Sequence, residues 1–313
     1  MCDLHGLCHA CRPQRDWAVE VRRNQVVVVT GATGGIGSAT SQLLSGDGYV
    51  IVAQYCTNSA KAEQLASAIA EQGGRCVAVA ADLSDVEGVA QLVSSVRSLL
   101  DQDPSLELWG LVNNAAKLLG PGFDGATPEQ FDEYFAVNLR APFFLAQHLT
   151  MVMERGGSVV NVSSASAHFS SPGDIIYAMT KAGLESFTRN LAEAVAPLGL
   201  RVNTVVPGFT DNGHPAFRHA AVRQYMSSFA VLGDVSMPRT VAEAVRFLIS
   251  ERASRTTGAL LDVSGGSTLG ARGGRAASVG TLIDDMDTDS VQGRARTCDP
   301  SNRPPAVDEA HVP

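Results

Sequence analysis

The sequence has little positive charge, few cysteines and no long apolar run. Its 24 Lys and Arg residues are outnumbered by 32 Asp and Glu, which gives a formal net charge of −8 at pH 7. A protein that binds a phosphate backbone needs a basic face, so nucleic acid is not an expected partner. No apolar run reaches the roughly 18 residues of a bilayer span, and the first residues lack the apolar core of a secretory signal. We therefore expect no membrane partner and no secretion.

Cysteine is too scarce for a scaffold held together by disulfides. The chain has 6 cysteines in 313 residues, which favours a reducing compartment and a cytoplasmic location. Soft metal ligands are concentrated in the first eleven residues (Cys2, His5, Cys8, His9 and Cys11). No second cluster follows at the spacing of a zinc finger. We therefore expect an irregular Cys/His-rich extension over residues 1–24 and no metal site.

Short valine-rich runs alternate with longer segments that carry apolar residues at helical spacing. The short runs are apolar on both faces, which is typical of parallel strands covered by helices. They fall at residues 26–30, 49–54, 75–80, 108–113, 158–163, 200–206 and 259–263. Helices are predicted at residues 38–45, 60–72, 86–100, 131–155, 177–196 and 241–250. The alternation predicts an α/β fold, a single Rossmann-like doubly wound parallel sheet of about seven strands flanked by helices.

The composition changes at both ends of this pattern. The alternation supports one domain over residues 25–268. Residues 269–313 are rich in Gly, Ala, Arg, Asp and Pro and have no sustained apolar face. Such a segment cannot bury enough apolar surface to offset the entropy of ordering it, so we expect a disordered tail.

A glycine-rich turn directly follows the first predicted strand and opens the first predicted helix. Glycine permits a tight turn and lets the backbone approach a pyrophosphate. The helix N-terminus adds N–H donors and a positive dipole end. At this place in a βαβ series, the turn predicts a dinucleotide phosphate site. Its candidate members are Gly31, Thr33, Gly34, Gly35, Ile36 and Gly37.

A second group of residues has the chemistry of a carbonyl reductase. Tyr177 and Lys181 stand at i and i+4, on one face of a helix, and Ser164 lies thirteen residues before Tyr177. Reduction of a ketone by hydride needs an acid that protonates the developing alkoxide, and a phenol can be that acid. A neighbouring ammonium favours the phenolate and lowers the pKa of the phenol. A serine hydroxyl can orient the substrate oxygen.

These motifs, in this order, resemble the short-chain dehydrogenase/reductase family, whose signature is Thr-Gly-x-x-x-Gly-x-Gly. Four further matches are Asp82-Leu83, Asn113-Asn114-Ala115-Ala116, Pro207-Gly208 and Ser264-Gly265-Gly266, which follow the third, fourth, sixth and seventh predicted strands. The resemblance covers residues 25–266 and keeps the family's spacing. It implies the same Rossmann-like fold and a nicotinamide cofactor.

The resemblance also implies roles for individual residues. Tyr177 would be the general acid/base, and Lys181 would lower its pKa and bind the nicotinamide ribose. Ser164 would position the carbonyl, with Ser163 as an alternative that fits the spacing less well, and Asn138 would hold a proton-relay water. The remaining cofactor contacts fall on Asp82, Leu83, Asn114, Ala115, Ala116, Tyr177, Lys181, Pro207 and Gly208.

The end of the second predicted strand bears on the choice of cofactor. NAD-preferring members place a carboxylate there for the adenosine ribose, whereas this chain has Gln54. A 2′-phosphate would therefore meet no negative charge, and several donors follow (Thr57, Asn58, Ser59 and Lys61). We favour NADP(H). NAD(H) stays the alternative, because Gly34 and Thr57 replace basic residues that are common in NADP binders.

By resemblance, the nearest branch is that of the 3-oxoacyl-carrier-protein reductases. The expected reaction is NADP(H)-dependent reduction of a ketone, on a small molecule or a carrier-bound acyl group. An NAD-dependent alcohol or sugar dehydrogenase and a cofactor-binding regulatory protein are the alternatives. Residues 208–238 carry aromatic and basic side chains and form either a substrate lid or an ordinary surface helix. Family members mostly pair through the helices predicted at 131–155 and 177–196, so a homodimer or homotetramer is expected.

Overall fold

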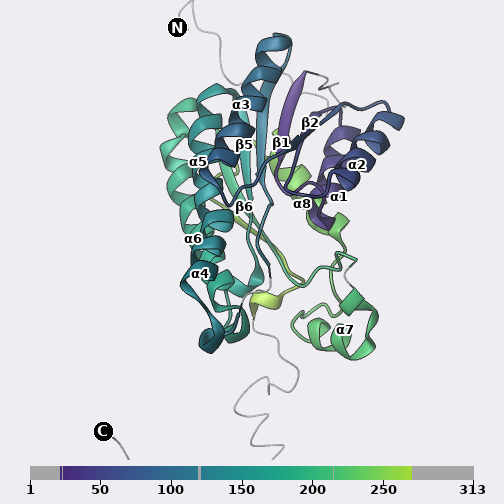
Figure 1. The fold of residues 1–313 in the computed structure, drawn as a ribbon, viewed down its shortest axis with the longest axis vertical. Coiled ribbons are helices and arrows are strands. Elements are labelled where there is room, and N and C mark those ends of the chain that lie inside the picture. The colour runs from purple at the N-terminus through teal and green to yellow at the C-terminus, as the bar shows by residue number, and fades with distance from the viewer. Residues whose placement is uncertain (1–21, 23, 119–120, 214, 270–313) are drawn as a thin grey trace, which may run out of the picture. The chain divides into compact units, whose positions relative to one another are not determined.

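A seven-stranded parallel sheet forms the centre of the molecule (Figure 1). This computed structural model describes residues 22, 24–118, 121–213 and 215–269, so most of the predicted extension and tail lies outside the described residues. The strands are β1 (Gln25–Val29), β2 (Val50–Tyr55), β3 (Cys76–Ala80), β4 (Glu107–Asn113), β5 (Met153–Val162), β6 (Arg201–Pro207) and β7 (Leu260–Val263). Their order is β3-β2-β1-β4-β5-β6-β7. This order confirms the predicted doubly wound sheet, and the winding reverses between β1 and β4, where open α/β sheets bind ligands.

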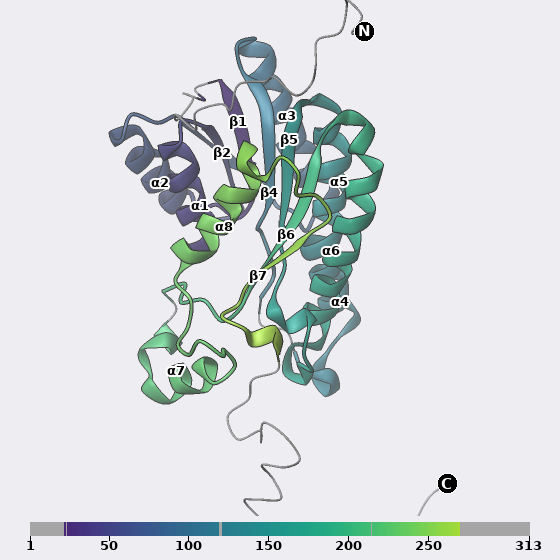
Figure 2. The ribbon, with the colours of Figure 1, turned by 180° about the vertical axis from the view of Figure 1, so that it is seen from behind.

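Helices cover both faces of the sheet (Figures 1 and 2). One face carries α3 (Val86–Gln102), α5 (Ala141–Leu149) and α6 (Ile175–Ala194), and the other carries α1 (Gly35–Gly46), α2 (Ser59–Glu71) and α8 (Pro238–Ile249). The pattern of β1 explains this arrangement, because successive strand residues point to opposite faces. Val26 and Val28 pack in the first core, Val27 and Val29 pack in the second, and all four are fully buried.

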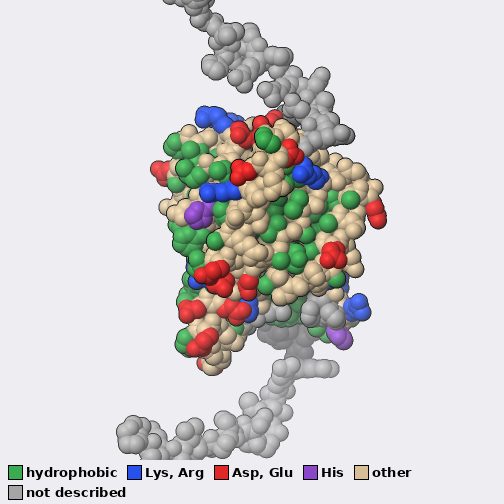
Figure 3. All heavy atoms as spheres, turned by 45° about the horizontal axis from the view of Figure 1, so that its top comes forward, with side chains coloured by type: hydrophobic (Ala, Val, Ile, Leu, Met, Phe, Trp, Pro, Cys, Tyr) green, Lys and Arg blue, Asp and Glu red, His purple; other side chains and the backbone are tan. Residues whose placement is uncertain are grey.

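Two shorter helices lie at one end of the sheet. They are α4 (Pro128–Phe135) and α7 (Ala220–Ser227). Both views place them at the same end but on opposite sides of the sheet (Figures 1 and 2). In the described part of the chain, every helix is too short or too polar to cross a lipid bilayer. On the face drawn in Figure 3, Lys and Arg side chains stand apart from one another among acidic and apolar side chains.

The structure corrects one predicted helix. The sequence predicts a single helix over 131–155, but α4 is followed by a π-helical turn at Ala136–Arg140, and α5 ends at Leu149. β5 then starts earlier than predicted, because Met153 pairs with Leu108 of β4. The register between β4 and β5 shifts after Leu108, and Gly156 has φ +95°. The polar residues that look like a last helical turn are therefore an irregular part of the strand.

Candidate active site

The glycine-rich turn between β1 and α1 is fixed by hydrogen bonds to the end of β4. The Thr30 hydroxyl accepts from the backbone N–H groups of Asn114 at 2.9 Å and Ala115 at 3.0 Å, and it donates to the Val112 carbonyl at 3.2 Å. The Asn114 side chain donates to the carbonyls of Thr30 at 2.9 Å and Gly31 at 3.2 Å. The turn is thereby held at the point where the sheet reverses its winding.

Two glycines of this turn cannot be replaced without moving the backbone. Gly31 has φ +61°, and a Cβ on it would lie 2.9 Å from the Cα of Ala115. A Cβ on Gly37 would overlap the carbonyl oxygen of Gly31. Gly34 caps α1 without a side chain, and the first turn of α1 has no acidic residue. The start of α1 therefore presents backbone N–H groups and a positive dipole end with no carboxylate among them, which fits a dinucleotide phosphate.

Gln54 lies behind this turn rather than on its open side. Its side chain is only 2% exposed. Its Oε1 accepts from the backbone N–H of Gly31 at 2.8 Å, and its Nε2 donates to the Ala81 carbonyl at 2.7 Å. Both ends of the amide are thus used to join the turn to the end of β3. Gln54 supports the cofactor loop, whereas the sequence interpretation treats it as a direct contact.

The other cofactor candidates lie along the carboxyl edge of the strands. Thr57, Asn58 and Ser59 are exposed after β2, and the Asn58 side chain accepts from the Lys61 backbone N–H at 3.0 Å to cap α2. Hydrogen bonds from Ser84 hold the pKa of Asp82 below its usual value. Two candidates can contribute little more than backbone, because Leu83 and Pro207 are buried. The loop at Gly208 demands glycine, since a Cβ there would lie 2.7 Å from the Ser264 carbonyl oxygen.

The structure brings Ser164, Tyr177 and Lys181 together where β5 ends and α6 begins. The hydroxyls of Ser164 and Tyr177 share a hydrogen bond. The Nζ of Lys181 lies 5.6 Å from the centre of the Tyr177 ring and donates to the Val162 carbonyl at 2.7 Å. Ser164 Oγ also accepts from the backbone N–H of Ser166 at 3.2 Å, which fixes the serine at the start of its turn.

Burial dominates the acid–base properties of this group. It raises the pKa of Tyr177 to about 12, against the lowering effect of the Ser164 hydrogen bond. It lowers the pKa of Lys181 to about 8, and the charge of Glu185 opposes this change. The direction for Tyr177 is opposite to the lowering that the sequence predicts, because the loss of hydration outweighs the favourable contacts. A phenol with a raised pKa is protonated at neutral pH, which is the state that a proton donor needs.

Asn138 lies in the π-helical turn and is fully buried. Its Oδ1 accepts from the backbone N–H of Lys117 at 2.7 Å, and its Nδ2 donates to the Lys117 carbonyl at 3.1 Å and to the Thr180 hydroxyl at 3.0 Å. That hydroxyl donates in turn to the Tyr177 carbonyl at 2.7 Å. Both polar atoms of the Asn138 side chain are therefore used to join the segment after β4 to the first turns of α6.

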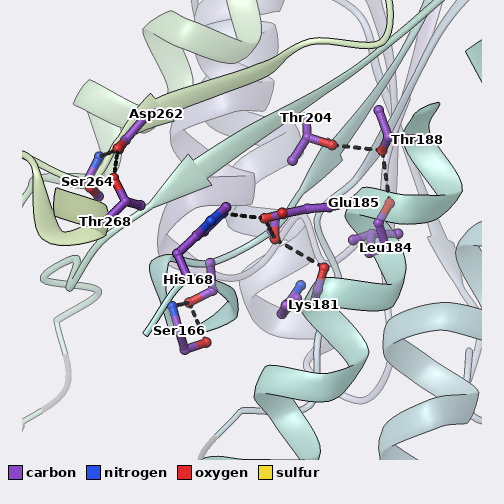
Figure 4. A network of polar contacts seen from close by, with 12 residues as sticks. Ser166, His168, Lys181, Leu184, Glu185, Thr188, Thr204, Asp262, Ser264 and Thr268 are labelled. Atoms are coloured by element: carbon purple, nitrogen blue, oxygen red, sulfur yellow. Dashed lines mark hydrogen bonds and ion pairs between the residues drawn. The ribbon is translucent and has the colours of Figure 1, made fainter. Parts of the chain in front are cut away.

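The sequence reasoning missed a buried carboxylate beside these residues (Figure 4). Glu185 is 6% exposed, and its Oε1 accepts from the Ser163 hydroxyl at 2.7 Å and lies 3.0 Å from His168 Nε2. The signal available in the sequence is its spacing, because Glu185 follows Lys181 by four residues and shares its helix face. Ser163, weighed above as the alternative catalytic serine, is buried and donates to Glu185 instead.

The described part of residues 208–238 contains the short surface helix α7, and ring contacts of Phe229 join this segment to the residues that follow β5 and β6. The ring of Phe229 has its centre 5.5 Å from that of Phe169, 5.2 Å from that of Phe209 and 5.3 Å from that of Tyr225. Phe169 belongs to the segment after Ser164, and Phe209 follows the Pro207-Gly208 loop. α7 itself buries no residue, and Tyr225 is 64% exposed. Two aromatic residues of this segment, Phe209 and Tyr225, therefore meet at Phe229.

Arg223, a basic residue of α7, already forms ion pairs with two carboxylates. Arg223 contacts Asp211 at 3.1 Å and Asp234 at 2.8 Å. Next to these residues, a hollow of about 490 Å³ is lined by residues 230, 232–236 and 240 on one side and residues 262–266 on the other. The segment thus offers aromatic rings near the end of the sheet, while Arg223 is paired and Arg218 is exposed.

Comparisons with known proteins place this architecture in a family. A family model described as Enoyl-(Acyl carrier protein) reductase matches residues 31–268. The chain belongs to the short-chain dehydrogenase/reductase family. An uncharacterized oxidoreductase of Bacillus subtilis, YmfI, is 31% identical over 249 residues, which covers 78% of this chain and 98% of that protein. The resemblance predicted from the motifs is confirmed, and the chain is an oxidoreductase of this family.

Relatives with more specific names are also similar. The hydroxynaphthalene reductase-like protein Arp2 of Metarhizium guizhouense is 30% identical and covers 78% of this chain and 94% of its own length. Among solved structures, the angucycline C-6 ketoreductase LanV with bound NADP is 36% identical, with a TM-score of 0.75 over 78% of this chain and 96% of that chain. The promiscuous reductase LugOII, which catalyses keto-reduction at C1 during lugdunomycin biosynthesis, is 35% identical, with a TM-score of 0.77 over 80% and 100%.

Proposed function

We propose that this enzyme reduces a ketone to a secondary alcohol with NADP(H). The proposal rests on one observation, which is that Ser164, Tyr177 and Lys181 lie together at the end of β5. The neighbouring strand is β4, and the residues at its end are hydrogen-bonded to the glycine-rich turn. Bound NADPH would supply the hydride at this edge of the sheet. The chain's own residues supply the proton and hold the ketone oxygen.

NADP(H) is favoured over NAD(H) by the residues around the glycine-rich turn. The start of α1 suits the pyrophosphate, and no carboxylate stands at the end of β2 to repel a 2′-phosphate. Thr57, Ser59 and Lys61 are exposed just beyond that strand and can donate to the phosphate. The LanV structure holds NADP, and a related blue fluorescent protein from a metagenomic library was solved with NADPH.

The proton in this reaction comes from Tyr177. As hydride adds to the carbonyl carbon, the ketone oxygen becomes an alkoxide and takes the phenolic proton, which gives the alcohol and leaves a phenolate. The Ser164 hydroxyl, already bonded to that phenol, can hydrogen-bond the same oxygen. The Lys181 ammonium stabilises the phenolate. Asn138 and Thr180 act as positioning residues, because they fix the turn of α6 that carries Tyr177.

An aromatic ketone is the better of two substrate classes. The cluster around Phe229 presents ring edges and faces, and flat aromatic molecules pack well against such groups. LanV and Arp2 carry names that refer to angucycline and hydroxynaphthalene substrates. An anionic, carrier-bound 3-oxoacyl thioester would need basic side chains, and of those in this segment Arg223 is already paired with two carboxylates, which leaves the exposed Arg218. The thioester is therefore the second candidate.

The Tyr177→Phe variant tests this reaction. Because phenylalanine keeps the ring but has no proton to give, kcat should fall roughly 100-fold or more, while the Kd for NADPH stays within a few-fold of the wild-type value. Fluorescence titration with NADPH measures binding, and NADPH oxidation measures turnover. A variant that keeps most of its activity would refute the acid–base assignment. A wild-type protein that binds NADPH but turns over no ketone would favour the regulatory alternative.

We also propose a homodimer or homotetramer built on α5 and α6. Large apolar side chains are exposed on or near these helices (Phe143, Phe144, Met151 and Met179, which are 39–70% exposed). Such side chains are typical of surfaces that a partner covers. Light scattering after gel filtration should give twice or four times the mass of 32.8 kDa, and Phe144→Glu should lower it. A monomeric wild-type protein would refute this assembly.

A further inference from the structure

Three consecutive residues of the chain each contact a different residue of the same helix face. Val162 accepts a hydrogen bond from Lys181, Ser163 donates one to Glu185, and Ser164 shares one with Tyr177. Tyr177, Lys181 and Glu185 follow one another at intervals of four on α6 and therefore line one face. The residue that the proposed mechanism does not use is Glu185. Glu185 is thus the third of three residues on one face of α6, and the other two, Tyr177 and Lys181, are those assigned to proton transfer.

A carboxylate at this depth requires partners, because burying a charge is unfavourable unless it is paired and hydrogen-bonded. Glu185 has them, since Ser163 donates to its Oε1 at 2.7 Å and His168 Nε2 lies 3.0 Å from the same atom (Figure 4). Ser163 also reaches the Lys181 carbonyl at 3.3 Å. The carboxylate thus joins the turn that carries Ser164 and His168 to the middle of α6.

We propose that Glu185 is a positioning residue of the active site, whose buried negative charge keeps Lys181 in its ammonium form and whose bonds to Ser163 and His168 anchor the Ser164 turn to α6. The proposal rests on the proposed function, in which Lys181 acts as a cation. Lys181 is 2% exposed, so little water is available to stabilise its charge. The negative charge of Glu185 supplies part of what water would supply elsewhere.

The electrostatic surroundings of Lys181 support this role. Burial lowers the pKa of Lys181 to about 8, and Glu185 is the charge that acts in the opposite direction. The titratable groups that bear on this row come from every adjoining element. They are Tyr177, Lys181 and Glu185 on α6, His168 in the preceding turn, Asp262 on β7 beside His168, and Asp174 and Tyr134 beside Tyr177.

The pH profile of kcat/KM for ketone reduction tests the charge of Glu185. In the wild type, kcat/KM should fall above about pH 8, as Lys181 loses its proton while Tyr177 keeps its own. Glu185→Gln keeps the shape and the acceptor for Ser163 but removes the charge, so the falling limb should move to lower pH by about one unit. Glu185→Asp, which keeps the charge, should leave the falling limb close to its wild-type position. A limb that stays in place in Glu185→Gln would overturn the proposal.

Two further variants separate charge from anchoring. Glu193→Gln removes an exposed carboxylate from the same helix and is the matched control, so its pH profile should equal that of the wild type. His168→Gln leaves Glu185 charged but weakens its link to the Ser164 turn. Its falling limb should stay in place while KM for the ketone rises by roughly threefold or more. An unchanged KM in His168→Gln would overturn the anchoring half of the proposal.

A measurement on the unmodified protein covers the case in which Glu185→Gln does not fold. Buried charge pairs are screened little by salt, so the falling limb should keep its position between roughly 0.05 and 0.5 M NaCl. A limb that moves with salt would assign it to an exposed group and overturn the proposal. The Tyr177→Phe variant keeps this inference separate from the proposed function. If that variant is inactive while Glu185→Gln behaves as wild type, the inference fails and the proposed function stands.

Discussion

The cofactor half of the site and the half that is proposed to hold the substrate are held in place by different kinds of contact. On the cofactor side, Thr30, Gln54 and Asn114 fix the glycine-rich turn through buried or part-buried side-chain bonds to backbone. On the substrate side, the segment around α7 is held by ring contacts of Phe229 and by the partly exposed ion pairs of Arg223. Hydrogen bonds to backbone demand particular atoms at particular distances, whereas ring packing tolerates many side chains.

This difference assigns separate tasks to the two halves. A turn that must place N–H groups against phosphate oxygens cannot change its path, so its residues are dictated by geometry. In the proposed function, the segment around α7 meets the substrate through apolar rings, and its side chains can change without moving the sheet or the turn. Changes on the first side should therefore affect cofactor binding, and changes on the second side should affect the ketone.

Gly37→Ala should have the largest effect, because it disturbs the glycine-rich turn that is expected to bind the cofactor phosphates. The added Cβ would overlap the Gly31 carbonyl, so the turn must move, and the Kd for NADPH should rise roughly 100-fold. Fluorescence titration with NADPH measures the change. Gly46→Ala is the matched control, because Gly46 lies at the end of the same helix with nothing within 4 Å of a Cβ. Equal affinities in the two variants would contradict the account of the turn.

Phe229→Ala tests the substrate half. It removes the ring that Phe169, Phe209 and Tyr225 share, so KM for an aromatic ketone should rise about tenfold, while the Kd for NADPH stays within about twofold. Steady-state kinetics at saturating NADPH measures KM. Phe247→Ala, which removes an exposed ring from α8, is the control and should leave both values unchanged. A loss of NADPH affinity in Phe229→Ala would show that the two halves are not independent.

Gln54→Asp tests how far a residue that supports the cofactor turn from behind also sets the choice between NADPH and NADH. Aspartate is one methylene shorter and cannot donate to the Ala81 carbonyl, and it adds a negative charge at the end of β2, on the side of the expected 2′-phosphate. The ratio of kcat/KM with NADPH to that with NADH should fall by about tenfold. Gln91→Asp, an exposed position on α3, is the control. An unchanged ratio would mean that the exposed residues after β2 set the preference by themselves.

Arg223→Gln should have the smallest effect. The two ion pairs of Arg223 are partly exposed, so their loss should lower stability by about 1 kcal/mol or less and change kcat/KM by less than about twofold. Thermal unfolding and ketone kinetics measure the two effects. A large loss of activity would show that Arg223 binds substrate directly, which would favour the anionic thioester.

The sheet, the glycine-rich turn and the Tyr177–Lys181 pair could be predicted from the sequence, because each depends on a pattern within a short segment. Strand periodicity, the glycine spacing and the i, i+4 placement of Tyr177 and Lys181 are properties of short segments. The start of β5 and the π-helical turn were not predicted, because they depend on pairing of Met153 with Leu108 and on Asn138 binding Lys117. Such contacts join residues that are distant along the chain.

The same reason explains the residues that were missed or misread. The ring cluster gathers side chains from three separate segments, and no local pattern announces it. The role proposed for Glu185 depends on its contacts with Ser163 and His168, which lie in the segment before its helix. Gln54 was correctly placed at the end of β2, but which way its amide points is decided by Gly31 and Ala81.

The most direct test of the central claim is the oxidation of NADPH and NADH, side by side, with a bicyclic aromatic ketone and with a short 3-oxoacyl thioester. We expect the wild-type protein to oxidise NADPH fastest with the aromatic ketone, and Tyr177→Phe to abolish this rate. Faster turnover of the thioester would keep the reaction and reverse the choice of substrate. Oxidation of neither cofactor with any ketone would contradict the claim that this site reduces ketones.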